Sequence, residues 1–170
     1  MANTFELIAS STVGAGGAAS IDFTSIPSTY TDLCVVASIR PTGAGFDGCY
    51  IYLNNDQTSG RYTSRVLRSN STTVASFVGG DTSKTYIGEL TPNTSNTFSN
   101  ISVWIPNYAG SNQKSMSIDS VGENNATDSY QVLTAGLYNQ TTAISQVSLR
   151  IASSNIAQYS TAYLYGVKNA

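Results

Sequence analysis

Short runs of alternating apolar residues, separated by turn residues, recur along the whole of this 170-residue sequence. Such alternation is typical of β-strands, and clusters of Gly, Pro, Asn, Asp and Ser between the runs indicate turns. The runs are residues 5–9, 20–23, 32–40, 49–54, 61–68, 73–78, 85–90, 98–106, 115–121, 130–139, 144–152 and 161–167. We therefore predict an all-β fold of about ten to twelve short strands, arranged as an antiparallel β-sandwich with a jelly-roll-like topology.

The composition favours this fold over helices and over disorder. Serine, threonine and asparagine make up about a third of the chain, and they compete with a helical backbone for hydrogen bonds. Disordered chains contain few aromatic residues, whereas 41% of this chain is hydrophobic and tyrosine occurs 11 times. The length fits a single domain over residues 1–170. Because of its glycines, the segment 1–20 is also compatible with an extended or flexible N-terminal arm.

Alternation identifies the core-facing residues of the clearest strands. In the run 32–40, Leu33, Val35, Ala37 and Ile39 share one face; Cys34, Val36, Ser38 and Arg40 share the other. Two later runs give the strongest apolar faces: Ile101, Val103 and Ile105, then Val147, Leu149 and Ile151. In the first run, Phe5, Leu7 and Ala9 are expected on one face. The runs 49–54 and 61–68 read as a hairpin across the polar turn 54–60.

Catalytic chemistry has little to build on in this sequence. The chain contains no histidine, which removes the commonest general base, triad partner and transition-metal ligand. Most of its ten carboxylates lie beside turn residues and are expected to bind turn amides. The segment 54–60 resembles a calcium loop faintly but lacks the bidentate glutamate of a tight site. We expect no enzyme activity, no cofactor and no metal.

Charge and hydropathy also limit the partners. The formal net charge is −2 with scattered basic residues, so we expect no binding to nucleic acid. No apolar run approaches the roughly 20 residues that span a bilayer, so no membrane segment is expected. Cys34 and Cys49 have no metal-ligand spacing and are interpreted as buried reduced thiols, although a disulfide between them remains open.

Two groups of residues are candidates for a protein interface. Arg61, Arg65 and Arg68 occur in one predicted strand, where they fit either a solvated edge that discourages aggregation or a docking contact to an acidic neighbour. Tyr163 and Tyr165 share a face of another strand, as do Tyr50 and Tyr52. Such rings serve either in a sandwich wall or at an interface.

Three segments stand out: "SIPSTYTDLCVVASIR" from residue 25, "IYLNNDQTSGRYTSR" from residue 51 and "AYLYGVK" from residue 162. Together they resemble a group of small virion proteins of tailed bacteriophages. The resemblance follows the order of the whole chain, and its specific motifs occupy about a fifth of it. It implies structural roles for Pro27, Thr29, Tyr30 and Asp32: Pro27 ends one strand, Thr29 and Asp32 satisfy turn amides, and Tyr30 covers the end of the core.

The same resemblance implies a function for the chain. Such proteins act as head decoration (cement) proteins or as tail-fibre and receptor-binding pieces. We therefore expect a structural virion protein, made in the bacterial host cytoplasm and placed on the particle surface. The first reading is a homotrimer that binds the major capsid protein and stabilises the head shell. The alternative is a tail-fibre or receptor-binding component that recognises a host surface glycan or protein.

Overall fold

The computed structural model describes residues 4–70, 72–91 and 94–168, and it is built from antiparallel strands. All twelve predicted runs form strands, with boundaries that differ by a few residues. The strands are β1 (Phe5–Thr12), β2 (Ser20–Phe23), β3 (Asp32–Ile39), β4 (Asp47–Leu53), β5 (Tyr62–Asn70), β6 (Thr73–Val78), β7 (Thr85–Leu90), β8 (Ser99–Pro106), β9 (Lys114–Glu123), β10 (Ser129–Tyr138), β11 (Val147–Ile151) and β12 (Thr161–Val167). The all-β prediction is confirmed.

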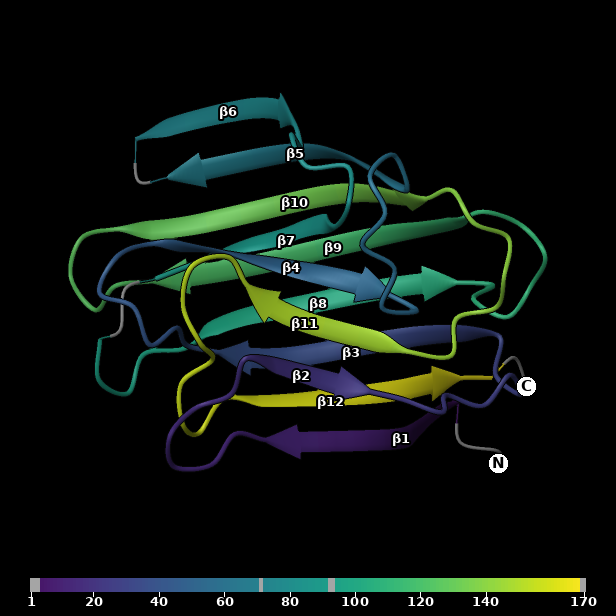
Figure 1. Cartoon of the computed structure of the whole chain (residues 1–170). Helices are drawn as coiled ribbons and strands as arrows, with labels where there is room; N and C mark the ends of the chain where they lie inside the picture. Colours follow the sequence, from purple (N-terminus) through teal and green to yellow (C-terminus); the bar gives the residue numbers. More distant parts are fainter. Residues whose placement is uncertain (1–3, 71, 92–93, 169–170) are drawn as a thin grey trace.

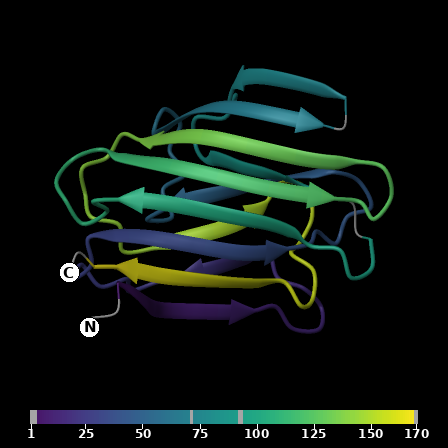
Figure 2. The ribbon, with the colours of Figure 1, turned by 180° about the vertical axis from the view of Figure 1, so that it is seen from behind.

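The strands form two sheets of unequal width that face each other as a sandwich (Figure 1). The wide sheet has eight strands in the order β1-β12-β3-β8-β9-β10-β5-β6. The narrow sheet has four, in the order β2-β11-β4-β7. Figure 2 shows the wide sheet from its outer side. We call the surface of the wide sheet that points away from the narrow sheet the outer face.

The strand pairing is nested. The pairs β1–β12, β2–β11, β3–β8 and β4–β7 lie one inside another along the sequence, and successive pairs alternate between the two sheets. This is the arrangement of a jelly roll, in which one long antiparallel ribbon is wrapped into two layers. Two further hairpins, β5–β6 and β9–β10, are inserted into this framework and widen one sheet only.

One hydrophobic core lies between the sheets. The alternating residues predicted for it are confirmed: Leu33, Val35, Ala37 and Ile39 are at most 2% exposed, and the sets at 101–105 and 147–151 are also buried. β3 is an interior strand of the wide sheet, between β12 and β8. Its outer side is not covered by another layer, however, and Val36 there is 38% exposed.

Small residues let β7 lie very close to β9 and β10. A Cβ atom on Gly88 of β7 would lie 2.3 Å from the Oγ atom of Ser120 in β9. A Cβ atom on Gly136 of β10 would lie 2.9 Å from a methyl carbon of Thr85. Since real Cβ atoms do not approach other atoms so closely, glycine is required on one side of each contact. Along β7, the narrow sheet therefore packs against the wide sheet so closely that Gly88 and Gly136 leave no room for a side chain.

Two local expectations differ from the structure. β4 and β5 do not form a hairpin: β4 pairs with β7 and β11, whereas β5 pairs with β6 and β10 in the other sheet. A bulge between Leu7 and Ala9 shifts the alternation, so Ala9 packs against the core while Leu7 points outward. Within residues 1–20, the segment of the possible N-terminal arm, residues 5–12 form β1, and residues 1–3 lie outside the described residues.

The loop that crosses from β4 to β5 is anchored by two buried tyrosines. The hydroxyl of Tyr62 accepts a hydrogen bond from the Leu53 amide at 3.0 Å and lies 3.0 Å from the Asp56 carbonyl oxygen, to which it can donate. The hydroxyl of Tyr138 donates to the Asp56 carboxylate at 2.9 Å, and the two rings stack at 4.8 Å. The amide of Thr58 also donates to that carboxylate. Asp56, the carboxylate in the segment that resembles a calcium loop, therefore accepts hydrogen bonds from the protein itself.

Both cysteines are free and buried. Cys34 points outward from β3 in the wide sheet, whereas Cys49 points into the core from β4 in the narrow sheet. The prediction of buried reduced thiols is confirmed. Burial raises the pKa of the Cys49 thiol to about 12, which disfavours the reactive thiolate.

The contact between Gly88 and Ser120 predicts a specific stability effect. We expect Gly88→Ala to lower the free energy of unfolding by about 1–3 kcal/mol, because the added methyl group overpacks the contact. The double variant Gly88→Ala, Ser120→Gly removes the serine side chain that the new methyl group would meet, so it should recover part of the lost stability. Denaturant unfolding measures both changes. Gly14→Ala is the control, since nothing lies within 4 Å of a Cβ atom there; an equal loss for Gly14→Ala would contradict the packing argument.

The hydrogen bonds of Tyr62 and Tyr138 predict that the folded state loses stability at alkaline pH. Burial, followed by the Asp56 carboxylate, raises the pKa of Tyr138 to about 12 from its ordinary 10.0, and burial also raises the pKa of Tyr62. Between pH 10 and 12, the folded state keeps the hydroxyl protons of these tyrosines, whereas the unfolded state loses them. The stability that they contribute is therefore fully present below pH 10 and is lost as the pH rises toward 12.

We expect the free energy of unfolding to fall between pH 10 and 12. Tyr138→Phe should make the dependence of this free energy on pH less steep, by the equivalent of up to one proton. Denaturant titrations at a series of pH values measure this slope. Tyr159→Phe, at a tyrosine that is 65% exposed, is the control. An identical slope for the wild type and Tyr138→Phe would rule out this anchor as the cause.

Candidate protein-binding face

The outer face exposes most of the large apolar side chains that the sandwich leaves uncovered. It is the second side of strands whose inner side fills the core, so its residues are those out of phase with the core pattern. They are Phe5, Leu7, Val36, Leu67, Val74, Val78, Trp104, Val121, Leu133 and Tyr163. Scattered exposed apolar residues are ordinary, but a concentration on one face is typical of a binding surface.

Aromatic residues dominate the half of the outer face formed by β1, β12, β3 and β8. The strand register sets Leu7, Tyr165, Cys34 and Trp104 in one row across these strands. The Phe5 ring meets the Trp104 and Tyr165 rings edge to face, with centroids 5.7 Å and 6.4 Å apart. We call Phe5, Leu7, Trp104, Tyr163 and Tyr165 the aromatic patch.

The two tyrosines predicted as interface candidates lie in this patch. Tyr163 is 38% exposed and Tyr165 is partly buried, and their rings stack at 6.5 Å. They point away from the core, so they do not form a wall between the sheets. Their role in binding remains a prediction. Sequence reasoning missed Trp104 and Phe5, although the signal was present: Trp104 is out of phase with the core residues Val103 and Ile105.

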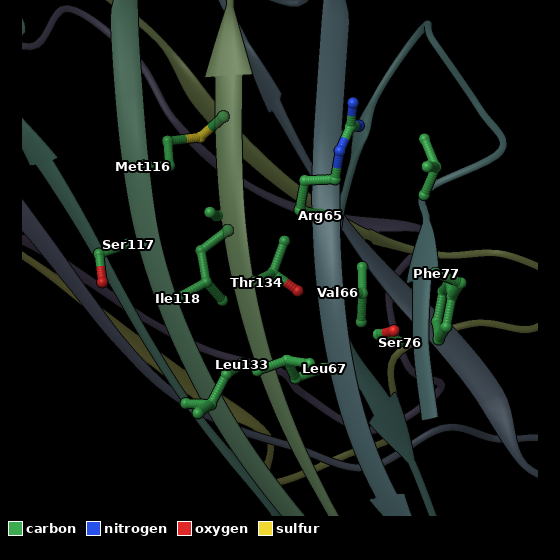
Figure 3. Close-up of a pocket in the computed structure, with 12 residues that line it drawn as sticks. Arg65, Val66, Leu67, Ser76, Phe77, Met116, Ser117, Ile118, Leu133 and Thr134 are labelled. Carbon is green, nitrogen blue, oxygen red and sulfur yellow. The ribbon is translucent and has the colours of Figure 1, made fainter. Parts of the chain in front are cut away.

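The other half of the outer face, formed by β9, β10, β5 and β6, is hollowed into an apolar groove of 630 Å³ (Figure 3). Leu67 and Leu133 lie directly opposite each other on β5 and β10, and Arg65 lies opposite Ala135. Val78 and Ser76 of β6 line the groove on the side of the sheet edge. Between the groove and the aromatic patch lie the polar residues Ser102 and Asp119.

The structure separates the three arginines that the sequence placed together. Arg61 precedes β5 and lies 3.6 Å from the Asp56 carboxylate. Arg65 points outward beside the groove. Arg68 points to the opposite side of β5, where it forms an ion pair with Glu89 at 3.2 Å. They do not form one patch. β5 is also not an edge strand, because β6 pairs with its residues Arg65–Asn70.

Arg68 belongs to a cluster that fixes the β5–β6 hairpin against β7. The guanidinium lies over the Phe77 ring of β6, 5.6 Å from its centroid, and binds Glu89 of β7. The Tyr86 hydroxyl donates to the same carboxylate at 2.6 Å, and burial together with this contact raises the pKa of Tyr86. Tyr50 and Lys84 complete a small polar pocket of 180 Å³ beside this cluster. No sequence signal links Arg68 to Glu89, because the contact depends on how the two sheets meet.

The predicted turn residues lie at one end of the sandwich. Asp32 accepts a hydrogen bond at 2.8 Å from the amide of Asn107, which belongs to the turn after β8 and not to its own turn. The Tyr108 hydroxyl donates to the Pro27 carbonyl, and the Tyr30 amide donates to that hydroxyl at 3.4 Å. The side chain of Thr29 is exposed.

Tyr30 lies over Gly166 of β12, where a Cβ atom would be 2.3 Å from the ring. Its hydroxyl donates to Glu6 at 3.1 Å, and Lys168 binds the same carboxylate at 2.8 Å. The ring packs against the core. Among residues 4–70, 72–91 and 94–168, no group of three or more His, Cys, Asp or Glu side chains is placed to hold a metal ion. In the same ranges, no helix is long and apolar enough to cross a membrane.

No family model matches the chain, and no curated protein matches it. Among solved structures, one match carries the description "Prominent members of the human gut microbiota express endo-acting O-glycanases to initiate mucin breakdown". It is 12% identical, covers 87% of this chain and has a TM-score of 0.23. The chain spans 59% of the length of that structure's chain. At this TM-score the likeness carries no argument about function.

The hairpin cluster predicts a local change of stability. We expect Glu89→Gln to speed amide hydrogen exchange in β5 and β6 by up to about fivefold, because Arg68 loses its partly exposed charged partner. Exchange in β3 and β12, which β8 and β9 separate from the cluster in the wide sheet, should not change. Mass spectrometry of the exchanged peptides measures both regions. Glu123→Gln, at an exposed carboxylate that ends β9, is the control; a uniform change across all strands would contradict a local role.

Proposed function

We propose that this chain is a structural virion protein of a tailed bacteriophage that binds the head shell as a decoration (cement) protein. The observation that carries the proposal is the outer face, which combines the aromatic patch with the apolar groove. Tyr, Trp and Phe are enriched at the centres of protein interfaces, and charged residues are depleted there. The virion and shell assignments come from the sequence resemblance, and the outer face supplies a surface suited to such a contact.

The proposed partner is the major capsid protein, and the proposed location is the particle surface. The function needs no catalytic group or cofactor, because binding to the folded state alone stabilises both partners by mass action. A sandwich with one uncovered apolar face suits this role, since one side can meet a shell while the narrow sheet faces outward. The homotrimer implied by the resemblance would follow the local three-fold symmetry of a shell.

A second candidate function is a tail-fibre or receptor-binding component. The observation that favours it is the 180 Å³ pocket beside β7, which combines the rings of Tyr50, Phe77 and Tyr86 with charged groups. Aromatic rings with nearby polar groups can hold a sugar ring. Binding of the purified chain to an array of bacterial surface glycans would favour this candidate, and Tyr50→Ala should then abolish the signal.

The decoration proposal predicts how the chain binds shells. Purified wild-type chain should sediment with expanded head shells that lack it, and a Trp104→Ser, Tyr163→Ser variant should bind at least about tenfold more weakly, because it loses aromatic contact area. The shells come from the phage that encodes the chain. Circular dichroism confirms that the variant is folded.

The matched control is Tyr159→Ser, which removes an exposed aromatic residue from a loop outside the outer face. It should bind like the wild type. Wild-type binding by the double variant would exclude the aromatic patch as the docking surface. A particle that carries the 17.9 kDa chain at only a few copies would exclude decoration altogether.

A further inference from the structure

The two sheets have four edge strands, and three of them carry protection against pairing with another chain. Sheet edges are commonly guarded by bulges, charges, short length or a covering segment. β1 has the bulge between Leu7 and Ala9 and the ion pair of Glu6 with Lys168. β2 is only 4 residues long. β7 has the β5–β6 hairpin fixed beside it through Arg68 and Glu89.

β6 lacks these protections. All six of its residues are exposed, and its sequence TVASFV contains no charge and no proline. Its pairing with β5 is regular from Asn70–Thr73 to Arg65–Val78, without a bulge. It is rich in residues that favour strands, since Val74, Phe77 and Val78 are β-branched or aromatic. An uncharged, regular edge of this kind is suited to strand addition.

The backbone of β6 offers its free hydrogen-bonding groups at known positions. The Gly79 amide donates to the Ser64 carbonyl at 3.1 Å, which marks Gly79–Ser64 as a hydrogen-bonded pair. In an antiparallel ladder such pairs alternate along the strand. Thr73, Ala75 and Phe77 therefore bond to β5, while the N–H and C=O groups of Val74, Ser76 and Val78 point away from the sheet.

We propose that β6 pairs antiparallel with β6 of a second copy of this chain, about a two-fold axis through Ser76. This register places Ser76 opposite Ser76 and Val74 opposite Val78. It uses all three free positions and forms about six backbone hydrogen bonds. Residues that face each other in a sheet point to the same side, so Ala75 then lies opposite Phe77, a small residue against a large one.

The side chains on both faces suit this pairing. No charges of like sign meet across the axis, because β6 has none. On the outer face, the valine pairs continue the apolar groove of one copy into that of the other. The hairpin cluster at Arg68 and Glu89 holds β6 in place before pairing, which reduces the entropy lost on association.

The pairing is independent of the proposed shell contact, because it uses the sheet edge and not the aromatic patch. A closed two-fold contact gives a dimer of the free chain. The homotrimer that the sequence resemblance implies would then be imposed by the shell and not by a contact between free copies.

Analytical ultracentrifugation over a concentration series tests the pairing. The wild type should approach twice 17.9 kDa at high concentration. Ser76→Pro should raise the dissociation constant about tenfold or more, since it removes an outward N–H group but no bond to β5. The matched control is Ser76→Ala, which keeps the N–H group and should dimerise like the wild type. Circular dichroism checks that each variant is folded.

A charge exchange tests the register itself. Ser76→Lys and Ser76→Glu should each be monomeric, because two like charges would meet on the axis. An equal mixture of the two variants should recover the dimer. A monomeric or trimeric wild type would overturn the proposal, and so would dimers that survive both Ser76→Pro and Ser76→Lys. Failure of the mixture to associate would overturn the register. None of these results bears on shell binding, which the Trp104 and Tyr163 variants test separately.

Discussion

The unequal width of the two sheets is the constraint on which the rest of the structure depends. Four strands cannot cover eight, so the wide sheet extends past the narrow one along β5 and β6. Two consequences follow on the inner side. β7, the last strand of the narrow sheet, is held close to β9 and β10 through glycine contacts at Gly88 and Gly136. The overhanging hairpin is then fixed to β7 by Arg68 and Glu89.

The same mismatch explains where a partner could bind. Jelly-roll wrapping buries one side of the strands that lie between the two edges of the wide sheet, and nothing in the described chain covers the other side of that sheet. The residues left there include the aromatic patch and the groove, with few charges between them. In the proposed virion role this surface meets the shell. The sheet edge at β6, whose residues are all exposed, is a separate feature and in our inference serves contacts between copies.

Local patterns in the sequence were enough to find the strands, but not to pair them. The alternation in 101–105 and in 147–151 depends only on residues two positions apart, so it can be recognised in the sequence without knowing the fold. Pairing depends on contacts between distant residues. The polar turn 54–60 resembles a hairpin turn, yet it joins strands of different sheets. β7 and β11 pair with the two sides of β4, so β5 cannot pair with it. The bulge at Leu7 and the ion pair of Arg68 with Glu89 leave no trace in sequence spacing. The exposed position of Trp104 could have been predicted, since it breaks phase with its core neighbours.

The central functional claim is that the outer face of the wide sheet is the surface that meets the shell. A reconstruction of intact particles by electron cryo-microscopy tests it most directly. We expect density for this chain on the head at many symmetry-related positions, with Trp104 and Tyr163 against the shell protein and the narrow sheet toward solvent. Density at the tail, or a chain whose outer face is turned to solvent, would contradict the claim.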